Sequence, residues 1–346
     1  MSRRPLMLFT GEFWAGASAR GLSDGFRDLG WAVQEVDQRD FGVKRGKSPV
    51  LRIASRLTRR MAEEAYRARL LEECRVLKPD IFLTVKGVGI TADFLQEVRR
   101  AGAKTVMYFP DFHFDHPGVS VESFAGYDLF VTTKTFQLDY LENLLGPEHV
   151  AYVPHGFSGC VHEPVYSNMP ESDFEADVLH AGNHSAWKQR WLEGAAAALP
   201  DASFRVVGNS WRENAGGGPL ARSDMPGPRL GIGYAGAIQA ARINIAVHFG
   251  PTASGWEDRV STRTFEIPAC KGFMLHIDNE EVRAFFEPGV EIDVFSTPEE
   301  LADKIGFYLA RPELRAQMIE RAYARCVPAY SYAARAKQIA DQLETI

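Results

Sequence analysis

The feature that most constrains the fold is the alternation of short apolar runs with longer amphipathic segments along the chain. The apolar runs include PLMLFTG, DIFLTVKG and KTVMYFPD, which are typical of strands buried on both faces of a parallel sheet. The segments between them carry apolar residues at helical spacing and are long enough to connect parallel strands. This alternation predicts an α/β protein built from doubly wound parallel sheets.

The chain is expected to form two domains, because 346 residues exceed the usual single-domain range. A polar, proline-containing stretch over residues 163–176 interrupts the alternation, which then restarts. We therefore expect domains over residues 1–162 and 163–330, with a final helix over 331–346 that is a candidate to pack back on the first domain. The Gly- and Pro-rich residues 213–231 are expected to form a mobile loop.

Composition restricts the class of partner and the compartment. A net charge of -6 argues against global attraction to nucleic acid or to an anionic membrane, so a small molecule is the expected partner. The four cysteines lie far apart and suggest neither a zinc site nor a disulfide framework. The N-terminal apolar run is too short for a signal peptide, and no run is long enough for a membrane span. A cytoplasmic protein is expected.

One short stretch, STRTFEIPACKGF at residues 261–273, combines charges with small residues between two apolar runs. Proline is tolerated near the start of a helix, so Pro268 predicts a helix that begins near Thr262 or Thr264, with Glu266 in its first turn. On helix physics alone, Glu266 complements the positive end of the helix dipole and Arg263 is a solvated neighbour. The stretch is open to a functional interpretation as well.

The same stretch, with FFEPGVEIDVFSTPEELADKIGFYLARPELRAQM after it, resembles the C-terminal half of the CgeB-like, glycosyltransferase group 1 family. The resemblance implies the GT-B fold, with two Rossmann-like domains that face a cleft. It implies a nucleotide-sugar donor on the second domain and a carbohydrate, protein or small-molecule acceptor on the first. The nucleotide sugar is then a substrate, and neither a cofactor nor a bound metal is expected.

The resemblance also implies roles for individual residues. Glu266 is expected to accept hydrogen bonds from the 2- and 3-hydroxyls of the donor ribose, since a carboxylate offers two acceptor oxygens. Arg263 and Lys188, rather than the neighbouring Arg190, are expected to contact the diphosphate. Retaining relatives carry a second acid eight residues before the motif glutamate, where this chain has the shorter Asp258. The donor site is expected to include three further residues, Gly182, Asn183 and Thr264.

Candidates in the first domain are weaker. Asp111 and His155 follow predicted strands and are candidate bases in case the enzyme inverts the anomeric configuration. Asp111 also opens the run DFHFD, whose alternating Asp111, His113 and Asp115 would share one face of an extended strand, an arrangement that suits metal ligands. A loop that touches the acceptor and a plain structural loop are the other interpretations of this run.

The function expected from the sequence is glycosyl transfer from a nucleotide sugar to an unidentified acceptor, independent of metal and with retention of configuration. Two alternatives stay open. One is a nucleotide-sugar epimerase on the same fold, which needs no acceptor. The other is a non-catalytic protein that binds sugar nucleotides or serves surface assembly.

Overall fold

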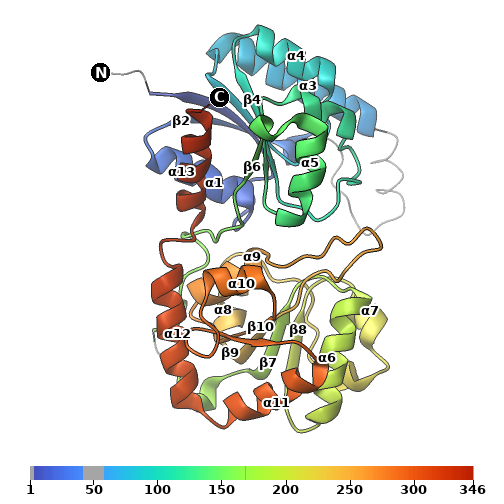
Figure 1. The fold of residues 1–346 in the computed structure, drawn as a ribbon, viewed down its shortest axis with the longest axis vertical. Coiled ribbons are helices and arrows are strands. Elements are labelled where there is room, and N and C mark those ends of the chain that lie inside the picture. The colour runs from blue at the N-terminus through green and yellow to red at the C-terminus, as the bar shows by residue number, and fades with distance from the viewer. Residues whose placement is uncertain (1–3, 42–57, 168, 346) are drawn as a thin grey trace. The chain divides into compact units, whose positions relative to one another are not determined.

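A computed structural model describes residues 4–41, 58–167 and 169–345, which form two compact units (Figure 1). The first unit comprises Met1–Pro154 and Tyr332–Ile346, and the second comprises His155–Ser331. The boundary at 154/155 precedes the expected boundary at 162/163. Each unit is built on its own parallel sheet, so the predicted doubly wound α/β architecture is confirmed.

The first unit has a parallel sheet of six strands in the order β2-β1-β3-β4-β5-β6. Five of the six strands coincide with apolar runs of the sequence, whereas β2 mixes apolar and polar residues. The chain adds β2 on one side of β1 and then β3 to β6 on the other side. The strands are β1 (Leu6–Gly11), β2 (Ala32–Asp37), β3 (Ile81–Val85), β4 (Lys104–Phe109), β5 (Leu129–Thr132) and β6 (Val150–Tyr152). The helices are α1 (Ser18–Asp28), α3 (Arg59–Leu77), α4 (Ala92–Arg100), α5 (Leu138–Leu145) and α13 (Tyr332–Leu343).

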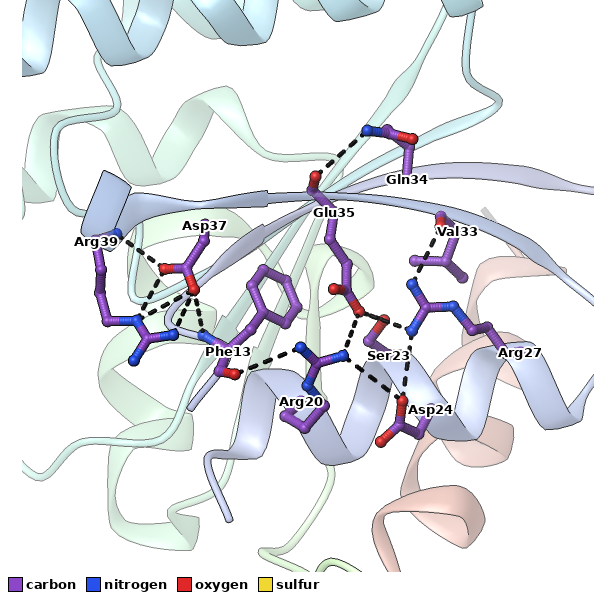
Figure 2. A network of polar contacts seen from close by, with 10 residues as sticks. All are labelled: Phe13, Arg20, Ser23, Asp24, Arg27, Val33, Gln34, Glu35, Asp37 and Arg39. Carbon is purple, nitrogen blue, oxygen red and sulfur yellow. Dashed lines mark hydrogen bonds and ion pairs between the residues drawn. The ribbon is translucent and has the colours of Figure 1, made fainter. Parts of the chain in front are cut away.

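Edge strand β2 is tied to helix α1 by a polar network, which Figure 2 shows. The Glu35 carboxylate accepts hydrogen bonds from Ser23 Oγ at 2.6 Å, from Arg27 Nη1 at 2.7 Å and from Arg20 Nη1 at 3.2 Å. Central strand β3 is buried at every position, whereas β2 is largely half-exposed. Charged contacts therefore supplement apolar packing at this edge of the sheet.

Helix α13 packs closely against α1 in the first unit (Figure 1). Two glycines of α1 make the close approach possible. A Cβ atom on Gly21 would lie 2.5 Å from Tyr332 Cδ2, and one on Gly25 would lie 2.7 Å from Ala333 Cα. The apolar side of α13 is part of the core of this unit.

The second unit has a parallel sheet of five strands in the order β11-β10-β9-β7-β8. Its strands are β7 (Ala176–Ala181), β8 (Phe204–Val207), β9 (Ala241–Ala246), β10 (Met274–Ile277) and β11 (Asp293–Phe295). Its helices are α6 (Ala186–Ala198), α7 (Trp211–Ala215), α8 (Ile232–Gln239), α9 (Thr262–Ala269), α10 (Glu280–Phe285), α11 (Pro298–Leu309) and α12 (Pro312–Cys326). No helix in the described ranges of either unit combines the length and the apolar character that crossing a bilayer requires.

The expectation of a mobile loop over residues 213–231 was wrong for its first half. Helix α7 and a 3₁₀ turn at Pro219–Arg222 occupy it, anchored by the buried side chains of Trp211 and Leu220. The indole Nε1 of Trp211 also donates a hydrogen bond to the carbonyl oxygen of Gly182, at 2.7 Å. These anchors fix a segment whose Gly and Pro content alone suggests mobility.

Candidate functional site

The candidate site lies in the second unit, at the carboxyl ends of β7 and β9. The chain runs from β7 outward to β8, and returns to build β9, β10 and β11 on the other side of β7. Parallel sheets bind ligands beyond the strand ends at such a reversal, because the connecting segments diverge there. The segments that follow β7 and β9 include Gly182–Lys188 and His248–Asp258, with most of the predicted donor-site residues.

Helix α9 presents the motif residues at this edge. It begins at Thr262, as predicted, with Ser261 as its N-cap. The expectation that Pro268 lies in the first turn was wrong, because Pro268 is in the last turn of this short helix. Proline there sacrifices only the backbone bond to the carbonyl of Thr264, which a helix near its end tolerates. Glu266 consequently lies in the second turn, away from the terminus where the helix dipole acts most strongly.

Lys188 is a buried cation in the first turn of α6. It is only 2 % exposed, and its Nζ donates a hydrogen bond to the carbonyl oxygen of Asn183 at 3.0 Å. Nζ also lies 4.6 Å from the centre of the Phe249 ring. Burial, followed by the charge of Arg263, lowers the pKa of Lys188 to about 7, against a smaller opposing effect of Asp258. The structure therefore brings Lys188, Arg263 and Asp258 together.

The Arg263 guanidinium packs on the backbone at the end of β7. A Cβ atom on Gly182 would lie 3.0 Å from Arg263 Nη1, and one on Gly208 would lie 2.1 Å from the carbonyl oxygen of Gly182. Both glycines are thus needed for close approach. Arg263 Nε is buried and has no hydrogen-bond partner within the described residues. The amide oxygen of Asn183 accepts two hydrogen bonds from Asn209, so that side chain holds the β7 and β8 loops together.

Glu266 points into a buried polar environment. Its side chain Oε2 accepts a hydrogen bond from the Tyr234 hydroxyl at 2.8 Å, and Oε1 lies 3.7 Å from His162 Nε2. Burial and the negative charge of Glu266 raise the pKa of Tyr234 well above its ordinary value, so the phenol stays protonated and donates. The carboxylate is therefore held by side chains rather than exposed to bulk solvent.

Three histidines that sequence reasoning missed lie at the same edge. His180, His248 and His276 stand at or just beyond the carboxyl ends of the neighbouring strands β7, β9 and β10. Each is the polar residue that closes an apolar run, in DVLHAGN, INIAVHFG and GFMLHID, and this recurrence was the available signal. Burial lowers the pKa of His180 well below its ordinary value, and the charges of Arg263 and Lys188 lower it further.

The side chain of Thr264 is fully buried and points toward strand β10. Its hydroxyl lies 3.0 Å from His276 Nε2, which is also 2.9 Å from His248 Nε2. Burial lowers the pKa of His276 to about 4, so the neutral ring donates from Nδ1 to the carbonyl of Ile277 and accepts at Nε2. Thr264 thus joins α9 to β10 through a hydrogen bond.

The two predicted first-domain candidates belong to different units. Asp111 is in the first unit and forms an ion pair with Lys86 at 2.8 Å, whereas His155 is buried and belongs to the second unit. The alternation around Asp111 reflects burial of the aromatic residues, because Phe112 and Phe114 are buried and the polar residues beside them are more exposed. Across the described ranges, no group of three or more His, Cys, Asp or Glu side chains is placed to hold a metal ion.

Comparison with known families identifies the part of the chain that carries this site. Residues 185–341 match a family model described as glycosyl transferase-like. This part of the chain is therefore similar to glycosyltransferases. The match supports the predicted glycosyltransferase assignment for these residues, which make up less than half of the chain, and the CgeB-like subgroup stays a prediction. No curated protein sequence matches the chain.

Solved structures share the complete fold. Sucrose-phosphate synthase from Thermosynechococcus elongatus is 13% identical, with 99% of each chain covered and a TM-score of 0.66. HepE of Anabaena, solved in complex with UDP, is 14% identical, with 99% of this chain and 100% of that chain covered and a TM-score of 0.63. A Listeria monocytogenes protein assigned as a UDP-N-acetylglucosamine 2-epimerase is 9% identical, with 99% and 96% covered and a TM-score of 0.59. The predicted GT-B fold is confirmed.

Proposed function

We propose that the protein transfers a sugar from a nucleotide-activated donor to an acceptor, independently of metal and with retention of configuration. The observation that carries the proposal is the arrangement of Arg263, Glu266 and Lys188. Arg263 and Glu266 are three residues apart on α9 and so lie on neighbouring positions of its surface. Diphosphate and ribose are likewise adjacent in a nucleotide. Lys188 adds a second cation beside Arg263.

The proposed chemistry uses charge in a partly buried site. The departing nucleoside diphosphate gains negative charge as the glycosidic bond breaks, and Lys188 and Arg263 would stabilise that charge. Asp258 is close enough to Lys188 to favour its charged form, and it is the candidate contact for the transferred sugar. Arg263 is a partly buried arginine whose buried Nε has no hydrogen-bond partner within the described residues, and it is suited to an additional anionic ligand.

Uridine diphosphate sugars are the first donors to test, because HepE binds UDP and UDP-glucose on the same fold. The acceptor class stays open among carbohydrate, protein and small molecule. The second candidate function is nucleotide-sugar epimerisation, because the Listeria protein assigned as an epimerase shares the fold. An epimerase alters the donor sugar with no acceptor present, so product analysis with donor alone separates the two functions.

The experiment is a thermal-shift screen with UDP-, GDP- and TDP-sugars, followed by assay of nucleoside diphosphate release. A ligand at 100 times its dissociation constant stabilises the folded state by about 2.7 kcal/mol. The Arg263→Ala variant should lose this shift. The matched control is Arg190→Ala, since Arg190 is an exposed cation of α6 that stacks on Trp187.

Two outcomes would refute the proposal. One is the absence of a shift with every donor, and the other is a shift that Arg263→Ala leaves intact. Binding without release or transfer of the sugar, with any acceptor fraction tested, would favour the non-catalytic alternative.

A further inference from the structure

The two oxygens of Glu266 have different surroundings. Oε2 accepts the hydrogen bond from Tyr234, whereas no hydrogen bond reaches Oε1 from any residue that the structure describes. His162 Nε2 lies 3.7 Å from Oε1, which is beyond hydrogen-bond length but close enough for electrostatic attraction. One edge of the carboxylate is therefore fixed by the protein, and the other keeps its acceptor capacity.

The tautomer of His162 follows from its other contact. Its Nδ1 accepts the backbone N–H of Ser158 at 3.1 Å, so the neutral ring carries its proton on Nε2, the nitrogen nearest to Glu266. The Tyr234 ring packs edge-on against the His162 ring at 5.7 Å. The carboxylate thus has one hydrogen bond, from Tyr234 of α8, and one longer electrostatic contact, from His162 in the turn at 158–162.

We propose that Tyr234 and His162 are positioning residues that orient Glu266 toward a pair of adjacent hydroxyls, and so make the site select ribonucleotides over 2′-deoxyribonucleotides. The inference rests on the proposed function, because it takes Glu266 as the ribose contact. A carboxylate whose rotation is fixed directs its remaining lone pairs in set directions. A donor without the 2′-hydroxyl then leaves a buried acceptor unsatisfied, which costs more than the lost bond alone.

Sugars linked to UDP, GDP, ADP or CDP carry both ribose hydroxyls, whereas those linked to TDP lack the 2′-hydroxyl. The site should therefore discriminate against TDP-sugars irrespective of the sugar that they carry. Loss of a hydrogen bond to a charged group lowers affinity by roughly 10- to 100-fold.

The test measures dissociation constants by calorimetry for UDP, GDP, ADP and CDP and for their 2′-deoxy counterparts. The full-length protein is compared with Tyr234→Phe and with His162→Asn, whose amide oxygen replaces Nδ1 as the acceptor for Ser158. The matched control is Tyr308→Phe, which removes a similar bond, from the Tyr308 hydroxyl to Asp293 Oδ2 at 2.9 Å, elsewhere in the same unit. The quantity of interest is the ratio of the deoxy to the ribo dissociation constant.

The expected ratio is roughly 10 to 100 for the unmodified protein and for Tyr308→Phe, and it falls at least threefold in Tyr234→Phe and in His162→Asn. Ribonucleotide binding with a ratio that neither variant changes would overturn the positioning role while leaving the proposed function intact. A ratio near one in the unmodified protein would also overturn it. Failure of every nucleotide to bind would overturn the inference together with the proposed function.

Discussion

Replacing Lys188 by Met should make the protein more stable and a poorer nucleotide binder at the same time. Lys188 is nearly fully buried, and its pKa in the folded protein is about 7 in place of 10.5. Each difference of one in pKa corresponds to about 1.4 kcal/mol. Burial and Arg263 therefore disfavour the charged amine by roughly 5 kcal/mol at most. Methionine keeps the length of the side chain and removes the charge.

The pH dependence gives the sign of the effect. Below pH 7 the amine is charged in the folded and the unfolded states, so the full cost is present in the unmodified protein. Between about pH 7 and 10.5 the folded state carries the neutral amine, and the cost declines as pH rises. We expect Lys188→Met to be roughly 2 to 4 kcal/mol more stable at pH 6, after allowance for the lost bond to Asn183. The difference should shrink by pH 9.

The assay is urea unfolding at several pH values, followed by tryptophan fluorescence. The second unit contains four of the six tryptophans, Trp187, Trp191, Trp211 and Trp256, so the signal reports chiefly on the unit that holds Lys188. Affinity for UDP is measured in parallel and should fall at least tenfold. A variant that is less stable than the parent at pH 6, or one that binds UDP equally well, would refute the reasoning and make Lys188 a structural residue.

The pH dependence of UDP binding, the packing of α1 on α13 and the role of Asp258 can each be tested separately. The dissociation constant for UDP should rise by up to tenfold per pH unit above pH 7, because binding the diphosphate then requires Lys188 to take up a proton. Calorimetry in buffers of different ionisation enthalpy measures this proton uptake. The absence of proton uptake on UDP binding at pH 8 would contradict the prediction. Gly25→Ala should destabilise the first unit by about 1 to 3 kcal/mol in urea unfolding, since its Cβ would lie 2.7 Å from Ala333 Cα, whereas Asp28→Ala on the same helix should have little effect. Asp258→Asn should reduce turnover more than UDP affinity, and an equal loss of both would contradict a contact with the transferred sugar.

Local patterns were sufficient to predict the strands and the start of the motif helix. The apolar runs PLMLFTG and DVLHAGN become β1 and β7 because parallel strands are buried on both faces, and a strand buried in this way is apolar along most of its length. The start of α9 was predicted from Pro268, and Ser261, which caps the helix, is a second local signal for a start at Thr262. Lys188 and Arg263 could be proposed as partners because both belong to segments at the carboxyl edge of one sheet.

Contacts between distant residues could not be predicted from one sequence. Tyr234 and Glu266 are separated by 32 residues, and nothing near Tyr234 in the sequence indicates that its hydroxyl meets a carboxylate. The same applies to the first half of residues 213–231, where the burial of Leu220, and of Trp211 just before this range, overrides a composition typical of loops. The position of Pro268 was misjudged because a helix of eight residues loses only one backbone bond to a proline in its last turn.

The most direct test of the account is the structure of the protein crystallised with UDP. The account predicts that the diphosphate oxygens lie within hydrogen-bond distance of Lys188 Nζ and the Arg263 guanidinium, with the ribose hydroxyls on Glu266 Oε1. Electron density for the nucleotide at another site, with Glu266 still bound only to Tyr234, would contradict it.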